Sequence, residues 1–453
     1  MSQHIFREYD IRGVADTDFA DKALGPLSKA IGTFLRRHGQ VRSVAVGRDC
    51  RTSSPRIAET LKQGLMSCGL KVVDVGEVPT PVLYFSVPHL KTDAGIMITG
   101  SHNPPEYNGF KIALGSGTLH GAPIQAIGEI LRSADFLAGD GFAEKQEVLE
   151  AYWKRIVSDI QHPLGLKVVV DSGNGMGGVA APELFRRLGC EVTELFSEPD
   201  GRFPNHHPDP TVPENLTFLL DAVKKQGADV GVGFDGDADR IGAVDPTGRI
   251  LFGDELLALY ARQVLKANPG ATIISDVKAS NRLFDDIAKH GGRPILWKTG
   301  HSLIKAKMKE ENALLAGEMS GHMFFRDRYY GFDDAIYAAA RLFEILAQEK
   351  RSPAMLLSDL PPSFVTPELR VDCPDATKFA VVEASRKEFL KQGLKVNAID
   401  GARVEFSDGW GLVRASNTQP VLVLRFEAST EKRLQEIRGS IEGVVKAQLA
   451  AAN

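Results

Sequence analysis

The sequence has few cysteines and no extended hydrophobic run. Four cysteines occur among 453 residues, and no two form a C-x-x-C pair; they are Cys50, Cys68, Cys190 and Cys373. This spread argues against a structural zinc site or a disulfide framework, and it fits a reducing compartment. No stretch of about 18 apolar residues occurs, so no membrane span is predicted. The first ten residues carry charges where a signal peptide needs an apolar segment, and we therefore expect a cytoplasmic protein.

An excess of charge of either sign is also missing. The formal net charge is −4, from 54 Lys and Arg against 58 Asp and Glu. Without a basic field, neither nucleic acid nor a membrane surface is expected as a partner. Small anions remain possible ligands, because a local cluster of Arg or Lys is enough to bind them. Single cores stop growing near roughly 250–300 residues, so the chain length predicts two to four domains.

Short apolar runs alternate with amphipathic stretches along most of the chain. This alternation predicts α/β domains with largely parallel sheets. Leu216, Leu219, Leu220 and Val223 recur at helical spacings and indicate a helix. The predicted buried strands span residues 43–47, 72–75, 94–98, 167–170, 230–234 and 272–275.

The strand–loop pattern restarts about three times. The blocks contain polar, glycine-bearing loops at 99–103, 235–240 and 317–322. Ligands of α/β sheets bind beyond the carboxyl ends of the strands, so all three loops are expected to face one cleft. The block after Pro361-Pro362 differs, with two helical stretches and a strand pair around 415–420, and indicates a smaller α+β domain.

The loop after the strand at 94–98 displays a serine. Its sequence is T-G-S-H-N-P at 99–104, with His102 beside Ser101 and Lys111 ten residues further on. A reactive hydroxyl would suit this position, although an ordinary turn has the same composition. A nucleophile elbow needs a second glycine where Asn103 stands, which disfavours an acyl-transfer hydrolase.

Three carboxylates alternate directly after the strand at 230–234. At about 4 Å, each like-charge pair costs on the order of 4 kcal/mol at an effective dielectric constant of 20. A divalent cation would remove that repulsion, and carboxylate ligands favour Mg²⁺ over zinc. The loop is not an EF-hand, because Arg240 and Pro246 occupy the positions that need Gly and Glu. A solvated acidic turn is the alternative. The carboxylates are Asp235, Asp237 and Asp239.

Two further loops suit a sugar and a phosphate. The segment G-E-M-S-G-H at 317–322 mixes hydrogen-bond donors and acceptors, as carbohydrate hydroxyls require. The segment R-A-S-N-T at 414–418 lies between two strand-like runs and offers a guanidinium, hydroxyls and backbone N–H groups to a phosphate. Either loop is equally compatible with an ordinary turn.

One motif points elsewhere. The strand at 167–170 is followed by G-x-G-x-x-G at 173–178, and a second strand at 191–196 carries Glu194, with Glu198 close behind. This pattern is typical of a dinucleotide site and indicates, as one alternative, an NAD-dependent oxidoreductase. A tight strand–helix turn explains the same glycines.

In order, these loops resemble the motifs of the α-D-phosphohexomutase superfamily, and most of all its bacterial phosphomannomutase/phosphoglucomutase group. The resemblance covers essentially the whole chain. It rests on F-R-E-Y-D-I-R-G at 6–13, T-G-S-H-N-P at 99–104, D-G-D-A-D-R at 235–240, K-T-G-H at 298–301, G-E-M-S-G-H at 317–322 and R-A-S-N-T at 414–418.

The resemblance implies three consecutive α/β domains with mixed, mostly parallel sheets and a smaller C-terminal α+β domain, around a central cleft. We place these domains at 1–147, 148–249, 250–361 and 362–453. They would carry, in order, the phosphoserine, metal-binding, sugar-binding and phosphate-binding loops. The resemblance also implies a monomer that binds hexose phosphates.

The resemblance also implies roles for individual residues. Ser101 would be phosphorylated and would hold magnesium together with Asp235, Asp237 and Asp239. Catalytic candidates are Ser101, Lys111, His322, His102 and Arg12, with Lys111 and His322 as the general acid/base candidates. Substrate-binding candidates are Tyr9, Arg240, Lys278, Thr299, Gly300, His301, Glu318, Ser320, His322, Arg414, Ser416, Asn417 and Thr418.

The implied activity interconverts hexose 1-phosphates and hexose 6-phosphates of mannose and/or glucose. It would proceed through a phosphoserine enzyme and a hexose 1,6-bisphosphate, with Mg²⁺ as cofactor and glucose 1,6-bisphosphate or mannose 1,6-bisphosphate as activator. Phosphoglucosamine mutases of the same superfamily more often carry Gln at the position of Met319, but they remain an alternative. A sugar-phosphate binding module without catalysis is a further one.

Overall fold

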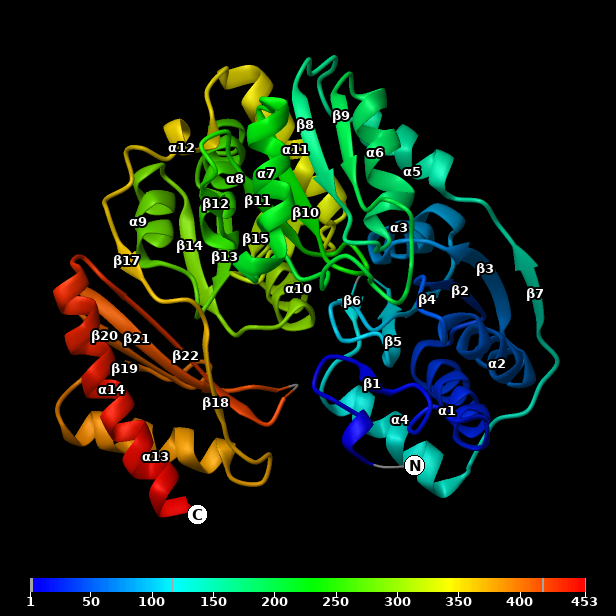
Figure 1. Ribbon diagram of the computed structural model, residues 1–453. Helices are drawn as coiled ribbons and strands as arrows, with labels where there is room; N and C mark the ends of the chain where they lie inside the picture. Colours follow the sequence, from blue (N-terminus) through cyan, green and yellow to red (C-terminus); the bar gives the residue numbers. More distant parts are fainter. Residues whose placement is uncertain (1–2, 116, 418, 453) are drawn as a thin grey trace.

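The chain is described by a computed structural model over residues 3–115, 117–417 and 419–452. Within these residues it forms four β-sheets, and each sheet together with its helices is called a lobe, numbered I to IV in chain order. Lobes II and III lie together, and lobes I and IV flank them on the lower side of Figure 1. Among the helices described, none combines the length and apolar character needed to cross a membrane.

Lobe I has a sheet with a parallel centre and an antiparallel edge. Its strand order is β1-β5-β4-β2-β3-β7, with β6 paired to β5. Helices α1, α2 and α4 cover one face and α3 covers the other. The elements are η1 Gln3–Ile5, β1 Ile11–Val14, α1 Asp21–Gly39, β2 Ser43–Arg48, α2 Ser54–Ser67, β3 Lys71–Glu77, α3 Thr80–Leu90, β4 Ala94–Ile98, β5 Tyr107–Leu114, β6 Gly117–Thr118, α4 Ala122–Ser133 and β7 Phe142–Lys145.

Lobe II repeats this plan with the order β12-β11-β10-β8-β9. Strand β10 is buried over its whole length, because α6 and α7 cover opposite faces of the sheet. The elements are α5 Leu149–Val157, β8 Lys167–Asp171, α6 Gly177–Arg187, β9 Glu191–Leu195, η2 Pro213–Leu216, α7 Thr217–Gln226, β10 Val230–Phe234, β11 Ile241–Val244 and β12 Ile250–Leu251.

Lobe III has the order β14-β13-β15-β16, with β13 parallel to both of its neighbours. Helices α8 and α11 cover one face and α10 the other. The elements are α8 Gly253–Ala267, β13 Thr272–Asp276, α9 Asn281–Lys289, β14 Arg293–Trp297, α10 His301–Glu310, β15 Leu315–Gly317, β16 Met323–Phe325, α11 Ala335–Glu349 and α12 Pro353–Leu356.

Lobe IV is antiparallel throughout, in the order β17-β22-β21-β20-β19 with β18 also paired to β22. Helices α13 and α14 pack on one face of the sheet. The elements are β17 Phe364–Val365, β18 Leu369–Asp372, α13 Lys378–Lys391, β19 Lys395–Asn397, β20 Ala402–Phe406, β21 Gly409–Ala415, β22 Val421–Ala428 and α14 Glu431–Ala452.

The expected fold class is confirmed. Every predicted strand is present, some extended by a residue or two, and the helix expected at 216–223 begins as a 3-10 turn before α7. The strand pair expected around 415–420 is β21 with β22. The domain boundaries, the monomeric state and the cytoplasmic location stay predictions.

The hydrophobic core is divided unevenly among the lobes. One continuous cluster joins lobes I, II and III, with Phe85, Phe185 and Tyr337 as members from each. Lobe IV has a core of its own under α13 and α14. Between lobes III and IV lies a small cluster around Val277, Trp410 and Leu412. Lobes I to III therefore hold one another in place, whereas lobe IV is joined to them through a narrower apolar contact.

Candidate active site

Ser101 is displayed at the junction of lobes I and II. It follows β4, is only 2% exposed, and has a left-handed backbone with φ of 50°. Its Oγ donates a hydrogen bond of 2.9 Å to Oδ2 of Asp235, and it lies 3.3 Å from Nδ1 of His102. Burial, with the charge of Arg240, lowers the pKa of His102 well below its usual range. His102 is therefore a neutral neighbour of the serine hydroxyl.

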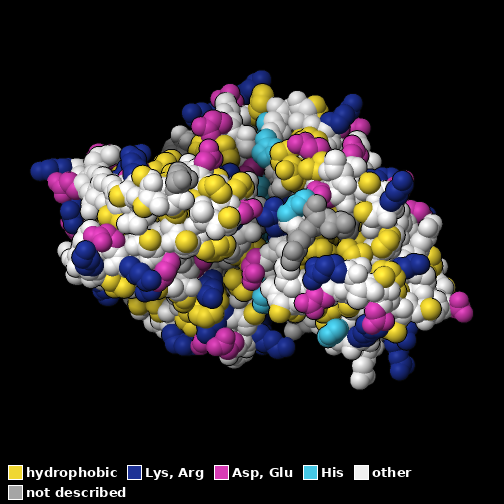
Figure 2. All heavy atoms as spheres, turned by 90° about the horizontal axis from the view of Figure 1, so that it is seen from below, with side chains coloured by type: hydrophobic (Ala, Val, Ile, Leu, Met, Phe, Trp, Pro, Cys, Tyr) yellow, Lys and Arg dark blue, Asp and Glu magenta, His cyan; other side chains and the backbone are white. Residues whose placement is uncertain are grey.

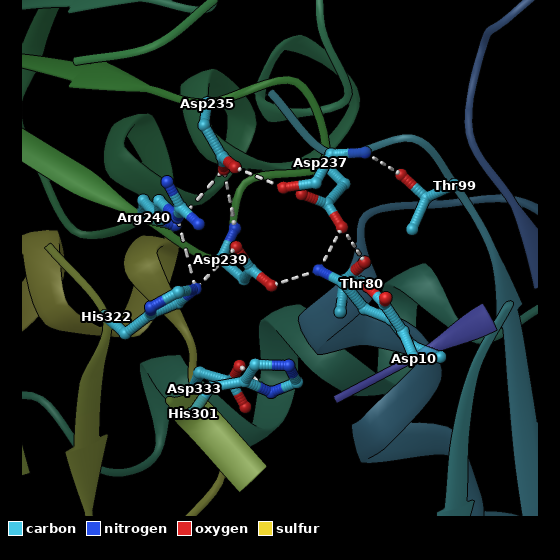
Figure 3. Close-up of polar contacts among 12 residues, drawn as sticks. Asp10, Thr80, Thr99, Asp235, Asp237, Asp239, Arg240, His301, His322 and Asp333 are labelled. Carbon is cyan, nitrogen blue, oxygen red and sulfur yellow. Dashed lines mark hydrogen bonds and ion pairs between the residues drawn. The ribbon is translucent and has the colours of Figure 1, made fainter. Parts of the chain in front are cut away.

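The loop at 235–240 after β10 is called the acidic loop, and the loop at 99–104 after β4 the serine loop. The two loops approach each other closely. A Cβ at Gly236 would lie 2.4 Å from the carbonyl oxygen of Ser101, so only glycine permits this approach. The carboxylate oxygens of Asp235, Asp237 and Asp239 lie within 4.8 Å of one another, and all three side chains are buried (Figure 3). The serine and the aspartates, separated by more than 130 residues, thus form one site.

The triplet fits a divalent cation. Oδ1 of Asp237 is buried and makes no hydrogen bond to any residue that the structure describes. Burial and the charges of Asp237 and Asp239 raise the pKa of Asp235 well above its usual range, although the charges of Arg240 and Lys111 oppose this shift. Oxygen-only ligands of this kind suit magnesium.

Lys111 lies against the same carboxylates. It is on β5, opposite Met97 of β4, and this register brings it near the end of β4 that leads to Ser101. Its Nζ lies 2.7 Å from Oδ2 of Asp237 and 2.5 Å from Oδ2 of Asp239. Burial alone would lower the pKa of Lys111, but the charges of the aspartates raise it. The protonated form of Lys111 is therefore favoured at the acidic loop.

Lobe III contributes a histidine from the loop after β15. Nε2 of His322 lies 3.2 Å from Oδ1 of Asp239, and Nδ1 lies 2.9 Å from Oε2 of Glu318 and 3.2 Å from Oγ of Ser320. Burial opposes a charge on the ring, but these carboxylates outweigh it and raise the pKa of His322 to about 9. Arg240 pairs its backbone with His322, which ties the acidic loop to this segment.

A second histidine stands at the start of α10. His301 lies with its ring centroid 5.6 Å from that of His322, and its Nδ1 is 3.4 Å from Oδ2 of Asp333. Lys305 binds the other oxygen of Asp333 at 2.6 Å. Burial and the charge of Lys305 lower the pKa of His301. The pKa values of the two neighbouring histidines are thus shifted in opposite directions. Both histidines are labelled in Figure 3.

The loop after β21 lies on the opposite side of the cleft. Nε of Arg414 donates to Oδ2 of Asp400 at 3.1 Å, and the amide of Asn417 donates to the hydroxyl of Tyr9 at 2.5 Å. Ser416 accepts from the backbone of Gln419 at 3.1 Å. Thr418, the last member of the predicted phosphate loop, lies outside the described residues. Seen from below, the molecule is hollowed between its two halves, and histidine side chains show within the hollow (Figure 2).

The remaining predicted residues lie around the same space. The hydroxyl of Tyr9 donates to the carbonyl of Thr299 at 2.7 Å, and the amide of Gly300 donates to Oε1 of Glu318 at 2.6 Å. Lys278 pairs with Glu368 of lobe IV at 3.1 Å.

Arg12 closes the other side of the serine loop. It donates to Oδ1 of Asn103 at 2.8 Å and pairs with Asp10. Every described residue of the predicted set is thus at or beside the cleft. Their roles stay predictions.

Some residues of the site were not found from the sequence. In the sequence, Asp333 is only a polar residue before a helix. Thr80 donates to Oδ2 of Asp237 at 2.5 Å, but its sequence position indicates only the start of a helix. Asp400, the partner of Arg414, lies in an ordinary turn. Their importance depends on contacts between lobes, which no local pattern encodes.

Other parts of the protein occupy the space beside the glycine motif at 173–178. A Cβ at Gly178 would lie 1.8 Å from the carbonyl of Ser197, and the amide of Met176 donates to the carbonyl of Gly236 at 2.9 Å. The loop therefore packs against the acidic loop from behind, and its glycines are explained by that packing.

Comparisons with known proteins agree with this geometry. Four models of the phosphoglucomutase/phosphomannomutase family match in order: α/β/α domain I at residues 3–138, domain II at 146–248, domain III at 252–364 and the C-terminal domain at 368–444. The chain belongs to this family. The family match covers all four lobes, and with them every loop that lines the cleft.

Individual members of the family match along almost their whole length. A phosphomannomutase/phosphoglucomutase of Pseudomonas aeruginosa is 50% identical over 443 residues, covering 98% of this chain and 96% of that protein. A phosphoglucomutase of Neisseria gonorrhoeae is 46% identical, covering 98% and 97%. A crystal structure of a family protein from Burkholderia thailandensis is 45% identical, with a TM-score of 0.93 and coverage of 100% and 99%.

Proposed function

We propose that this phosphohexomutase interconverts hexose 1-phosphates and hexose 6-phosphates of mannose and/or glucose by passing one phosphoryl group through Ser101. The observation that carries the proposal is the hydrogen bond of 2.9 Å between the Ser101 hydroxyl and Asp235, inside a triplet of buried carboxylates. A binding protein needs no hydroxyl beside a cation site. Relatives named for both sugars match this chain, so the preferred sugar is left to experiment.

The charges of the site suit a phosphorylated serine. A phosphate dianion on Ser101 adds about −2 to the three aspartates. Magnesium, held by Asp235, Asp237, Asp239 and that phosphate, would supply positive charge to stabilise the transferring phosphoryl group. Lys111 and Arg240 add two further positive charges, so that the buried site is nearly neutral.

In the first transfer, the bond between phosphorus and the Ser101 oxygen breaks and a bond forms to a hydroxyl oxygen of the bound hexose monophosphate. The proton of that hydroxyl passes to a side chain of the cleft, and the product is a hexose 1,6-bisphosphate. In the second transfer the other phosphoryl group returns to the Ser101 oxygen, and the proton goes back to the sugar. Phosphoryl transfer of this kind depends mainly on positioning and charge.

Three side chains are proposed to handle the proton. Lys111 and His322 are surrounded by carboxylates, which favour their protonated forms. His301 is neutral because burial and Lys305 lower its pKa, so it is able to accept a proton. Arg414, Ser416, Asn417 and Thr418 are proposed to hold the phosphate that is not reacting, and Glu318 with Ser320 to bind sugar hydroxyls.

The test is turnover of glucose 1-phosphate, mannose 1-phosphate and glucosamine 1-phosphate in parallel, with Mg²⁺ and glucose 1,6-bisphosphate present. We expect conversion of glucose or mannose 1-phosphate at least about tenfold faster than of glucosamine 1-phosphate, a difference of about 1.4 kcal/mol in the barrier. A preference for glucosamine would indicate a phosphoglucosamine mutase. Binding without conversion would indicate a binding module, and NAD(H) binding in a fluorescence titration would favour an oxidoreductase.

A further inference from the structure

Arg51 lies beneath the serine loop and is almost completely buried, with 1% exposure. Its guanidinium donates hydrogen bonds to four backbone carbonyls of that loop and its exit. The acceptors are the carbonyl oxygens of Ser101 at 2.8 Å, Asn103 at 2.5 Å, Pro104 at 2.5 Å and Tyr107 at 3.0 Å. One side chain thus fixes the path of the chain from Ser101 to Tyr107.

Asp49 also binds the serine loop and supports Arg51. Its Oδ2 accepts from Nε of Arg51 at 3.2 Å and from the backbone N–H of Gly100 at 3.1 Å. Its Oδ1 accepts from the hydroxyl of Ser54 at 2.5 Å, at the start of α2. The buried ion pair therefore holds the loop by its carbonyls through Arg51 and by an amide through Asp49, and anchors both to a helix.

The conformation of the loop depends on this support. Ser101 has a φ of 50°, which costs a residue with a side chain of order 1 kcal/mol and persists only when surrounding contacts enforce it. A Cβ at position 100 would lie 2.5 Å from Cζ of Arg51, so Gly100 allows the guanidinium to pack directly under the loop. The hydrogen bond from Arg51 to the carbonyl of Ser101 is one of the contacts that hold the strained residue.

Arg51 also lies at the joint between the serine loop and the lobe that carries the aspartates. Its guanidinium lies over the ring of Phe203 of lobe II, 5.1 Å from the centroid. A Cβ at Gly201, also in lobe II, would lie 2.4 Å from Cα of Arg51, which shows how closely the two backbones approach. The same residue thus contacts the serine loop and the lobe of the acidic loop.

We infer that Arg51, backed by Asp49, is a positioning residue for phosphoryl transfer: by binding four loop carbonyls and packing on lobe II, it keeps the Ser101 oxygen aimed at the aspartate triplet. The inference rests on the proposed function. Arg51 donates its hydrogen bonds to backbone carbonyls and to Asp49, so its contribution is to the reacting geometry and not to substrate affinity. The loop must return to the same position in both transfers although its charge changes between them.

The test compares Arg51→Lys with wild type. Lysine keeps the charge but cannot offer the planar fork of donors, so it cannot hold four carbonyls. We expect kcat and the rate of phosphoryl transfer from glucose 1,6-bisphosphate to Ser101 to fall by at least about tenfold, since misplacement by about 1 Å costs up to a hundredfold. The KM for the hexose 1-phosphate should stay within about twofold of wild type.

Arg341→Lys is the matched control. Arg341 is equally buried at 1% exposure and pairs with Asp327 within lobe III. Both variants should lower Tm, but only Arg51→Lys should slow phosphorylation of Ser101. If Arg51→Lys does not fold, Asp49→Asn takes its place, because it keeps the shape of the carboxylate and weakens the ion pair.

Three results would overturn the inference. The first two are an unchanged phosphorylation rate in the folded variant and a loss that Arg341→Lys reproduces. A rise in KM with unchanged kcat would likewise contradict it, since that pattern belongs to substrate binding. Wild-type protein is assayed in parallel. If wild type itself neither turns over hexose phosphates nor takes up a phosphoryl group, the proposed function fails, and that outcome is distinct from a defect confined to Arg51→Lys.

Discussion

The two ends of the cleft are built differently. The end with Ser101 and the aspartates lies where lobes I, II and III share one hydrophobic core. The end with Arg414 belongs to lobe IV, which has a separate core and meets lobe III through the small cluster around Trp410. Polar contacts add to that joint: Arg403 donates to the carbonyls of Val277 at 2.6 Å and Ala279 at 3.0 Å.

This difference in construction suits the different proposed roles of the two ends. We call the end with Ser101 and the aspartates the reacting end. Its proposed role needs fixed geometry, because phosphoryl transfer is slowed by small displacements. In the proposed function, the end with Arg414 must admit and release a sugar phosphate, and a lobe with its own core is able to move as a unit. Two polar contacts join lobes I and IV. They are the hydrogen bond between Tyr9 and Asn417 and the ion pair of Arg7 with Asp375 at 3.8 Å. We expect substitutions at the reacting end to affect kcat and those at the other end to affect KM.

Ser101→Ala should have the largest effect. Without the hydroxyl, no phosphoryl group can be carried at this position, so incorporation from glucose 1,6-bisphosphate into residue 101 should be abolished. Turnover with the bisphosphate supplied should fall by more than about tenfold, or 1.4 kcal/mol. Mass spectrometry of the protein and a coupled assay measure the two quantities. Full turnover in this variant would show that Ser101 is not the carrier.

Asp237→Asn should weaken metal binding while preserving the fold. The amide oxygen can still accept from Thr80 and Lys111, but the negative charge opposite the cation is lost. We expect the Mg²⁺ concentration for half-maximal activity to rise by at least about tenfold, by analogy with the loss of other groups that support metal sites. A metal titration measures this, and superimposable curves for variant and wild type would remove Asp237 from the ligand set.

Arg414→Lys tests the other end. A hydrogen bond from a charged donor is worth about 1.5–3 kcal/mol, so losing the planar fork should raise the KM for hexose 1-phosphate by about tenfold. The change in kcat should be smaller. Arg433→Lys is the control, because Arg433 is a half-exposed residue of lobe IV paired with Asp408. A loss of kcat at constant KM would place Arg414 at the reacting end and break the comparison.

Tyr9→Phe should have a smaller effect. The hydroxyl joins Thr299 of lobe III and Asn417 of lobe IV, and a neutral hydrogen bond contributes about 1 kcal/mol. The variant should therefore raise KM by a few-fold, roughly up to fivefold, and release more of the bisphosphate into solution. Bisphosphate release is measured during turnover, and unchanged release would mean that this contact does not close the cleft.

Asp334→Asn tests the shared core without touching the site. Burial raises the pKa of Asp334 to about 7, above about 3.9 in the unfolded chain. The folded state thus binds the proton more tightly, and this stabilisation is complete below about pH 4 and is lost as pH rises through about 7. The stability of wild type relative to the asparagine variant should fall by roughly 2–4 kcal/mol between pH 4 and pH 8. Denaturant unfolding at both pH values measures it, and a constant difference would contradict the raised pKa.

The sequence predicted the residues of the reacting end better than the side-chain contacts that join distant parts of the chain. Strand-end motifs placed Ser101, Asp237 and His322 in one cleft, because carboxyl ends of strands in α/β sheets collect ligands. It did not predict that Arg51 supports the serine loop or that Asp333 stands beside His301, since both depend on side chains that meet across long stretches of chain. The pairing of Lys111 with the aspartates needed the antiparallel register of β4 and β5, which no local pattern specifies.

The central claim is that Ser101 carries the phosphoryl group that turns over. Protein phosphorylated with isotopically labelled glucose 1,6-bisphosphate is mixed rapidly with unlabelled hexose 1-phosphate, and the label on each peptide is followed by mass spectrometry. The account predicts one phosphoryl group, located on Ser101, that leaves at least as fast as kcat. A label on another residue, or a label on Ser101 that leaves more slowly than product forms, would contradict it.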